Sequence, residues 1–223
     1  IENFASDVSH ELKNPITSLK SSNELLIQNK INQDQKNLLL KNMQKDIVRM
    51  NSLVTDISSY TLTQVEITDE LFYEFDLVAF LKEFLQSYND NKKSIKINFK
   101  HNQTISKIYA NKDKLAQVFI NLIDNSMSHS PNNSEILIDI KNTNESAIIY
   151  IADQGEGIPM NLKDKIFERF YTDRSSNQTK HTGLGLSISK KIVENFSGSI
   201  KLSNVKFKQY FGACFEINLP LKD

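Results

Sequence analysis

The sequence predicts an α+β protein, in which a two-helix hairpin precedes an α/β sandwich. Two observations support this class. Residues 1–63 contain a single proline and no glycine, and their apolar residues recur at alternating spacings of four and three. From residue 76 onward, helical and strand patterns mix without a regular βαβ alternation, which is typical of α+β domains. A chain of 223 residues has room for one or two such domains.

Two helical stripes define the first part. The polar segment 28–35 separates them and is expected to form the turn between two helices. An isolated hairpin has only one layer to bury against, so we expect two copies to associate into a four-helix bundle. The two stripes, which have the spacing of a coiled-coil seam, are Val8, Leu12, Pro15, Leu19, Ser22 and Leu26, then Leu39, Met43, Asp46, Met50, Leu53, Ile57 and Tyr60.

The second part is expected to combine three longer helices with several short strands. Residues 64–75 break the heptads and connect the two parts, so we predict a hairpin domain over 1–64, a linker over 65–75 and a second domain over 76–223. Helical periodicity marks 76–88, 112–130 and 183–196. Alternating or β-rich runs mark strands at 95–99, 105–109, 136–140, 147–152, 199–205 and 211–219, and 162–181 is polar and irregular.

Composition excludes several classes of function. The 27 basic residues balance the 27 acidic ones, so no general electrostatic argument favours nucleic acid as a partner. The single Cys214 excludes an intrachain disulfide and a cysteine-based zinc cluster. No apolar run reaches the roughly 18 residues of a membrane span. The chain begins with Ile1 rather than Met, so we expect a fragment of a longer protein, itself outside the membrane.

One histidine of the first helix stands in a distinctive setting. His10 lies between the stripe positions Val8 and Leu12, so its side chain should emerge on the accessible flank of the bundle. Asn14 lies one turn further on the same face. Pro15 removes a backbone hydrogen bond and should kink the helix nearby. A lone exposed histidine is usually a solvated surface residue, and only its sequence context favours a functional role.

That context resembles the H-box of sensor histidine kinases. The segment FASDVSHELKNPIT spans residues 4–17, and four further boxes of that family follow in order. They are an N-box at 117–131, a first glycine box at 153–159 (DQGEGIP), an F-box at 166–170 (IFERF) and a second glycine box at 182–188 (TGLGLSI). Each motif alone is weak, but five in the family order exclude chance similarity. The resemblance implies a dimerisation and phosphoacceptor (HisKA) hairpin followed by an ATP-binding domain of the Bergerat type.

The F-box overlaps the run FYTDR, and the N-box lacks the lysine common in relatives. Both features look most like the alphaproteobacterial ChvG/ExoS group of sensor kinases. The resemblance implies autophosphorylation on His10 with ATP and Mg²⁺. Glu11 would accept the proton of the other ring nitrogen and make the attacking one more nucleophilic. Glu11 and Asn14 also fit the ExxN pattern with which relatives dephosphorylate their regulator.

The N-box supplies the expected metal ligands. Asn121 and Asn125 lie one turn apart on one helical face, and amide oxygens suit Mg²⁺. The resemblance makes Asn125 the metal ligand and Asn121 its support, whereas periodicity alone fits ordinary surface asparagines equally well. Ser128 stands where relatives often carry a phosphate-binding lysine. His129 stands where an aromatic ring often lies against adenine.

The glycine boxes supply the remaining nucleotide contacts. The resemblance assigns Asp153 to the adenine amine, with Gly155 and Gly157 allowing close approach of the base. A plain turn after a strand has the same local sequence. Free N–H groups at the start of a helix suit phosphate, and the box there contains Gly183, Leu184 and Gly185. Residues 160–182 would form an ATP lid that carries Arg174, a candidate γ-phosphate contact.

The leading interpretation is therefore the core of a two-component histidine kinase at the cytoplasmic side of a bacterial inner membrane, anchored through its parent protein. It would act as a homodimer and pass the phosphoryl group to an aspartate of a response-regulator receiver domain. One alternative is another Bergerat-type ATPase, such as a relative of chaperones or topoisomerases. The other is a catalytically silent scaffold, which the serine at position 128 keeps open.

Overall fold

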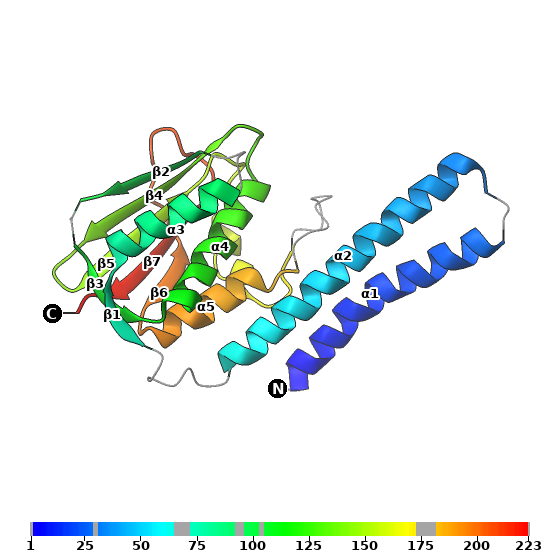
Figure 1. The fold of residues 1–223 in the computed structure, drawn as a ribbon, viewed down its shortest axis with the longest axis horizontal. Helices are drawn as coiled ribbons and strands as arrows, with labels where there is room; N and C mark the ends of the chain where they lie inside the picture. The colour runs from blue at the N-terminus through cyan, green and yellow to red at the C-terminus, as the bar shows by residue number, and fades with distance from the viewer. Residues whose placement is uncertain are drawn as a thin grey trace. The chain divides into compact units, whose positions relative to one another are not determined.

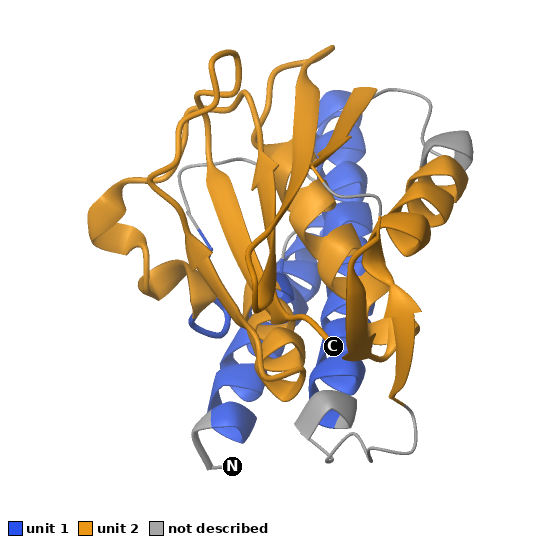
Figure 2. Cartoon of the chain, turned by 90° about the vertical axis from the view of Figure 1, so that its left-hand side faces the viewer, with its two compact units in different colours: residues 1–62, 168–185 blue, residues 63–167, 186–223 orange. Residues whose placement is uncertain are grey.

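The computed structural model describes residues 2–28, 31–64, 72–91, 96–102, 105–172 and 182–222. They form two compact units (Figure 2). Residues 1–62 and 168–185 make up unit 1, and residues 63–167 and 186–223 make up unit 2. Within the described ranges, none of the helices combines the length and apolarity that crossing a membrane requires.

Unit 1 is built on the predicted hairpin. Helix α1 covers Glu2–Ile27 and helix α2 covers Gln33–Gln64 (Figure 1). The helix α1 runs without interruption through Pro15. The backbone N–H of Gln35 donates to the Asn32 side chain at 2.9 Å, and the N–H of Asn32 donates to the Gln35 side chain at 3.0 Å. This reciprocal cap starts α2 inside the predicted turn 28–35, which is therefore shorter than expected.

The predicted seam is the better-buried side of the hairpin, but few of its positions are fully buried. Leu53 has no exposed surface, Ser22 is 7% exposed, and Pro15 is buried. The other stripe residues are half-buried. Several large apolar side chains instead face away from the seam and are 40% exposed or more, namely Ile16, Leu25, Ile27, Leu38, Leu40, Ile47, Val48 and Val54.

Unit 2 is organised around a five-stranded sheet with the strand order β2-β4-β5-β7-β6. Strand β2 runs parallel to β4, and the other neighbouring pairs are antiparallel. A separate pair, β1 with β3, is also antiparallel. The strands are β1 Tyr73–Asp76, β2 Lys96–His101, β3 Lys107–Ala110, β4 Glu135–Asn142, β5 Ser146–Ala152, β6 Ser199–Leu202 and β7 Cys214–Pro220.

Three helices, α3 (Leu77–Asn91), α4 (Lys112–Ser128) and α5 (Gly185–Asn195), cover one face of this sheet (Figure 1). Short 3₁₀ turns η2 (Met160–Leu162) and η3 (Lys165–Phe167) follow β5. Alternate residues of the strands point to the helices, and the register aligns them in rows. One row consists of Phe99, Ile138, Ile151, Phe215 and Leu202. Its four members after Phe99 are at most 7% exposed, so the core lies between sheet and helices.

The structure confirms the predicted α+β architecture and corrects some of its boundaries. The last two strands are shorter than predicted, because β6 ends at Leu202 and β7 begins at Cys214. Residues 203–213 instead form a connection closed by an isolated bridge between Phe207 and Tyr210. Part of the predicted linker, 65–71, lies outside the described residues, whereas residues 73–75 belong to β1.

Candidate functional site

The histidine singled out by the sequence lies on the surface of the hairpin. His10 and Asn14 are exposed on α1, one helical turn apart, as predicted. Glu11 is half-buried, and its Oε2 accepts a hydrogen bond from the Arg49 guanidinium at 2.9 Å. This ion pair links α1 to α2 and fixes one carboxylate oxygen of the residue that follows His10 in the sequence. The sequence interpretation gave Glu11 only His10 as a partner and missed Arg49.

A second acidic residue lies near this pair in α2. Asp46 is a predicted stripe position. Among the described residues, its buried Oδ2 has no hydrogen-bond partner, and the buried Nε of Arg49 also has none. Buried polar atoms of this kind are costly when they stay unpaired. The largely apolar seam of the hairpin therefore includes buried polar atoms of Asp46 and Arg49, and Arg49 is the residue that pairs with Glu11.

In unit 2, Asp153 directly follows β5 and is 2% exposed. Its Oδ1 accepts hydrogen bonds from the backbone N–H groups of Gly155 and Ala213, both at 2.9 Å. Burial raises the pKa of this carboxyl above its ordinary value, and the two N–H groups oppose the shift. Both of these hydrogen bonds end on Oδ1, so Oδ2 keeps lone pairs that a donor on a ligand can use.

A buried hydroxyl completes this part of the site. Ser126 of α4 has no exposed surface, and its hydroxyl faces the Asp153 carboxyl. In the described part of the chain no well-formed hydrogen bond reaches Ser126 Oγ. A carboxylate oxygen with spare lone pairs beside an unsatisfied buried hydroxyl suits a planar group that both donates and accepts hydrogen bonds. An adenine ring has this character.

The glycines of the first box are required by close packing and by backbone conformation. A Cβ on Gly155 would lie 2.4 Å from the carbonyl oxygen of His129, which ends α4. Gly157 has a φ of +80°, a conformation that side chains other than glycine rarely adopt. The loop after Asp153 is therefore held tightly against the end of α4.

The residues of the N-box lie on α4 as the periodicity predicts. Its predicted apolar face is fully buried, and Asn121 and Asn125 lie outside it as half-buried residues. Asn121 Nδ2 donates to Ser189 Oγ of α5 at 3.3 Å. The hydroxyl of Ser128 donates to the Asn125 carbonyl at 2.8 Å, so it closes the last turn of the helix. His129 is exposed and caps α4. The apolar face consists of Leu115, Phe119, Leu122 and Ile123.

The second glycine box belongs to unit 1 up to Gly185, where α5 begins. Gly183 has a φ of +77°, and a Cβ there would lie 2.6 Å from the Phe170 carbonyl carbon. The N–H of Leu184 donates to the Thr182 hydroxyl at 3.3 Å, and that hydroxyl donates in turn to the Asp56 carboxylate. The predicted phosphate contact Arg174 lies outside the described residues.

The sequence interpretation missed several residues that the structure brings to these sites. Arg49 is one of only three arginines against 24 lysines, and this rarity was the available signal. Gly212 and Ala213 directly precede the last strand and contact Asp153, which only the sheet register reveals. Asp56 reaches Thr182 across more than a hundred residues of sequence, a pairing that periodicity cannot predict.

Comparison with known proteins identifies the family. Residues 1–62 match the model of the His Kinase A (phospho-acceptor) domain, and residues 110–223 match that of the histidine kinase-, DNA gyrase B-, and HSP90-like ATPase. The second match covers half of the chain. The chain therefore belongs to the histidine kinase family and carries both its phospho-acceptor and its ATPase domain. The match to a phospho-acceptor domain argues against the chaperone or topoisomerase alternative.

Two similar relatives are sensor proteins called ChvG. The one from Rhizobium meliloti (strain 1021) is 36% identical over 99% of this chain and 40% of its own length. The one from Agrobacterium fabrum (strain C58) is 35% identical over 99% and 39%. These matches confirm the resemblance to the ChvG group, and the chain spans about two fifths of the length of these relatives.

Solved structures of histidine kinases share the fold. The histidine kinase ThkA, in a crystal structure with the response regulator protein TrrA, aligns with 99% of this chain and 61% of its own with a TM-score of 0.72. The sequence identity is 24%, so this likeness concerns the fold alone. It confirms the predicted succession of a helical hairpin and an α/β ATPase domain.

Proposed function

We propose that the chain is the core of a two-component sensor kinase that transfers the γ-phosphoryl group of ATP to His10. One observation carries the proposal: the exposed His10, followed in α1 by Glu11 whose carboxylate is fixed by Arg49, shares its chain with an ATPase domain whose Asp153 is buried and accepts two backbone hydrogen bonds. The proposed division of the chain is a phosphoacceptor hairpin over 1–64, a linker over 65–75 and a catalytic domain over 76–223.

The acceptor chemistry follows from the surroundings of His10. A neutral imidazole attacks the γ-phosphorus, so an N–P bond forms while the P–O bond to the departing ADP breaks. The ring becomes cationic on attack and then loses the single N–H proton of its other nitrogen, which Glu11 accepts directly or through water. The ion pair with Arg49 orients the Glu11 carboxylate for this role. Asn14, one turn away, is proposed to place the water that removes phosphate from the regulator, a second activity.

The base of the nucleotide is assigned to the loop after β5. Asp153 Oδ2 would accept the exocyclic amine of adenine, and Ser126 lies beside that carboxyl to complete the pattern. Gly155 and Gly157 keep side chains out of the approach of the base. His129, exposed at the end of α4, is proposed to stack on adenine.

The phosphates and the metal complete the proposed site. Asn125 would ligate Mg²⁺ through its amide oxygen, and Asn121 would hold the helix face through its bond to Ser189. A metal ion held there would supply positive charge that neutralises phosphate charge during transfer. The backbone of Gly183, Leu184 and Gly185 is proposed to bind phosphate at the start of α5. Arg174 remains a proposed γ-phosphate contact.

The proposed partners are a second copy of the chain and a response regulator. The exposed Leu40, Ile47 and Val54 recur every seven residues along α2, which is the spacing of a second helix-packing stripe. A homodimeric four-helix bundle would bury it. The solved complex of ThkA with TrrA supports a receiver domain as the acceptor. We further propose that the parent protein is membrane-anchored, with this part on the cytoplasmic side of the bacterial inner membrane.

The test is incubation of the chain with γ-labelled ATP and Mg²⁺. Label that is labile in acid and stable in base indicates phosphohistidine, and we expect it to be lost in His10→Gln and in Asn125→Ala. The matched control is His101→Gln, because His101 is an exposed histidine of β2 outside the proposed site. Label retained in His10→Gln would refute the assignment. Equal, negligible ATP binding by the wild type and Asn125→Ala would favour the scaffold alternative instead.

A further inference from the structure

The connection between β6 and β7, residues 203–213, directly contacts the proposed adenine-binding carboxylate. The N–H of Gly212 donates to the Asp153 carbonyl at 3.0 Å, and the N–H of Asp153 donates to the Ala213 carbonyl at 3.0 Å. The N–H of Ala213 donates to Asp153 Oδ1 at 2.9 Å. Three hydrogen bonds therefore fix both the backbone and the carboxylate orientation of Asp153 from this one connection.

The contact is so close that only glycine fits at its centre. A Cβ on Gly212 would lie 2.0 Å from Asp153 Oδ1 and 2.5 Å from the backbone nitrogen of Gly155. Neither neighbour can yield easily, because the carboxylate is itself bonded to Gly155 and Ala213. A methyl group at position 212 must therefore displace the carboxylate that is proposed to read the base.

The connection is anchored in turn by an aromatic residue. Tyr210 is 5% exposed and packs with Leu137, Ala152 and Cys214 on strands of the sheet. Its N–H donates to the Phe207 carbonyl at 3.0 Å, which closes the turn. The ring of Phe207 meets that of Tyr150 edge to face at 5.6 Å. This apolar cluster places the connection on the sheet only two residues before Gly212.

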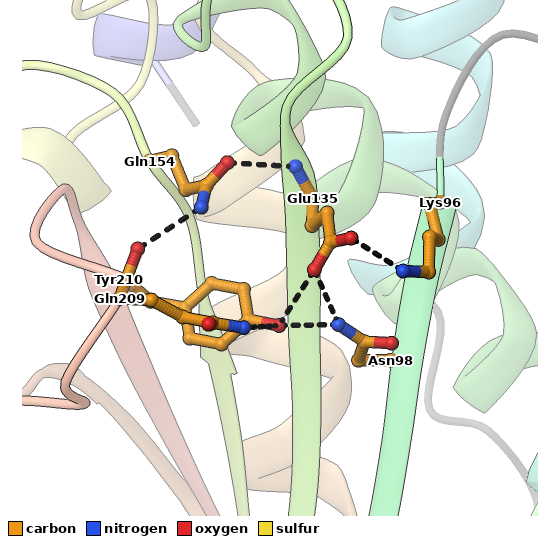
Figure 3. Close-up of polar contacts among 6 residues, drawn as sticks. All are labelled: Lys96, Asn98, Glu135, Gln154, Gln209 and Tyr210. Atoms are coloured by element: carbon orange, nitrogen blue, oxygen red, sulfur yellow. Dashed lines mark hydrogen bonds and ion pairs between the residues drawn. The ribbon is translucent and has the colours of Figure 1, made fainter.

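A polar network joins the same connection to the loop of Asp153 (Figure 3). Gln154 accepts a hydrogen bond from the backbone N–H of Glu135 at 2.9 Å and donates to the Gln209 carbonyl at 3.0 Å. The Tyr210 hydroxyl accepts from Asn98, which also donates to Glu135 Oε2 at 2.6 Å. The side chains drawn in Figure 3 thus link β2, β4, the loop after β5 and the connection into one cluster.

Lys96 completes the cluster at the edge strand. Its Nζ lies 2.6 Å from Glu135 Oε1, and this hydrogen bond lowers the pKa of the Glu135 carboxyl. Glu135 therefore stays ionised and acts as a fixed acceptor for Asn98. The network serves no step of the proposed phosphoryl transfer, and the residue it holds most directly is Gln154, next to Asp153.

We propose that Gly212, Tyr210 and Gln154 are positioning residues for base recognition, which hold the Asp153 carboxylate so that Oδ2 faces the adenine amine. The inference rests on the proposed adenine contact of Asp153. Adenine presents an amine donor where guanine presents a carbonyl oxygen, so a misplaced carboxylate loses affinity for ATP and also the preference for ATP over GTP. A residue that only stabilises the fold does not change that preference.

The test is equilibrium dialysis of the full chain with labelled ATP and Mg²⁺, in competition with GTP. We expect Gly212→Ala to bind ATP at least about tenfold more weakly and to lose most of the preference for ATP. The reason is that a small displacement of the carboxylate that recognises the base greatly weakens its hydrogen bond to adenine. Tyr210→Phe keeps the ring and removes the hydroxyl, and Gln154→Met keeps the length and removes both bonds. Each should weaken ATP binding about threefold with a smaller loss of preference.

The matched control is Gly198→Ala. A Cβ there would lie 2.4 Å from the Asn218 carbonyl oxygen, so the site is similarly crowded, but it contacts β7 away from Asp153. Its melting temperature should fall while the ATP preference stays. If Gly212→Ala does not fold, Tyr210→Phe and Gln154→Met still decide the question. Wild-type affinity and preference in the variants that fold would overturn the proposal.

One further variant separates this inference from the proposed function. Asp153→Asn should abolish the preference for ATP over GTP, since an amide no longer offers two equivalent acceptors. If Asp153→Asn behaves like the wild type, the adenine contact is wrong, and the positioning role falls with it. If Asp153→Asn loses the preference and the positioning variants keep it, the adenine contact stands and only the positioning role fails.

Discussion

The hairpin and the α+β unit bury their apolar residues very differently. In unit 2, rows of side chains such as Ile138, Ile151 and Phe215 have no exposed surface, and three helices cover the face on which they lie. In the hairpin, Leu53 alone among the large described side chains has none, and the α2 residues Ile47 and Val54 are 44% and 56% exposed. Unit 2 therefore has a complete core, whereas the hairpin leaves one apolar face uncovered.

This difference in burial corresponds to the different functions proposed for the two regions. A nucleotide site needs groups held rigidly, and Asp153, the proposed adenine contact, receives backbone hydrogen bonds from Gly155 and Ala213 next to the ends of β5 and β7. A phosphoacceptor needs access, and His10, the proposed acceptor, is exposed on a helix. The apolar face left over on α2 is what a second copy would cover. The stability of the two regions should accordingly depend on different conditions. That of unit 2 should rise with nucleotide, and that of the hairpin should rise with the concentration of the chain.

The largest effect should come from the complete core. Phe215 has no exposed surface, and its ring lies 6.4 Å from that of Phe167. Phe215→Ala should lower the free energy of unfolding by about 3–5 kcal/mol, because it removes apolar contact and leaves a cavity. Urea unfolding followed by circular dichroism measures this loss. The exposed Phe211→Ala is the control and should cost little. Equal losses would contradict a core centred on this row.

A smaller effect is expected at the uncovered face of the hairpin. The double variant Ile47→Lys, Val54→Lys places charge on the stripe that a second copy would bury. It should raise the dimer dissociation constant about tenfold or more, as for burial of an unpaired charge at an interface. Sedimentation equilibrium measures the average mass of the chain in solution as a function of its concentration, and so gives this dissociation constant. In unit 2, Ile105→Lys changes a side chain that is 62% exposed and should leave the mass unchanged. An unchanged dimer in the double variant would refute this interface.

The smallest effect concerns the stability cost of burying the Asp153 carboxylate, the group proposed to contact adenine. Burial raises the Asp153 pKa in the folded state above its ordinary value of 3.8, so the ionised form destabilises the fold. This penalty is complete above the folded pKa and disappears as the pH falls to the unfolded value. Asp153→Asn should therefore be more stable than the wild type at pH 7, with the gain fading toward pH 4.

Urea unfolding at several pH values measures this trend, and Asp113→Asn is the control, because Asp113 is exposed in the first turn of α4. The control should show no such gain. An Asp153→Asn variant that is less stable than the wild type at pH 7, yet equal to it at pH 4, would reverse the sign. That result would mean that the two N–H donors stabilise the ionised carboxylate by more free energy than its burial costs.

Much of the fold was predictable from the sequence, and so were the exposure of His10 and the helix that carries the two asparagines of the proposed site. Alternating residues predict the strand around Ile138, because a sheet with one face covered by helices favours this pattern, and a β-rich run predicts the strand around Ile149. The seam spacing placed His10 on an accessible flank, and the exposed side chain agrees. The boxes in family order pointed to Asp153 and the two asparagines.

The rest depends on contacts between residues distant in sequence. Nothing local marks Gly212 as the neighbour of Asp153, because only the pairing of β5 with β7 brings them together. The bond from Arg49 to Glu11 likewise requires the packing of two helices. The predicted strand reaching Val205 was wrong in its extent, because backbone pairing between Phe207 and Tyr210 closes a turn just after that residue. Periodicity identifies faces, whereas partners across an interface need the three-dimensional structure.

The central claim is that the α+β unit is complete in itself and ordered further by nucleotide, whereas the hairpin is completed by a second copy. Hydrogen exchange of the full chain tests it most directly, at two chain concentrations with and without ATP and Mg²⁺. We expect protection of α2 around Ile47 and Val54 to rise with chain concentration, and protection of residues 153–157 to rise with ATP. Protection of α2 independent of concentration, or no ATP effect at 153–157, would contradict the account.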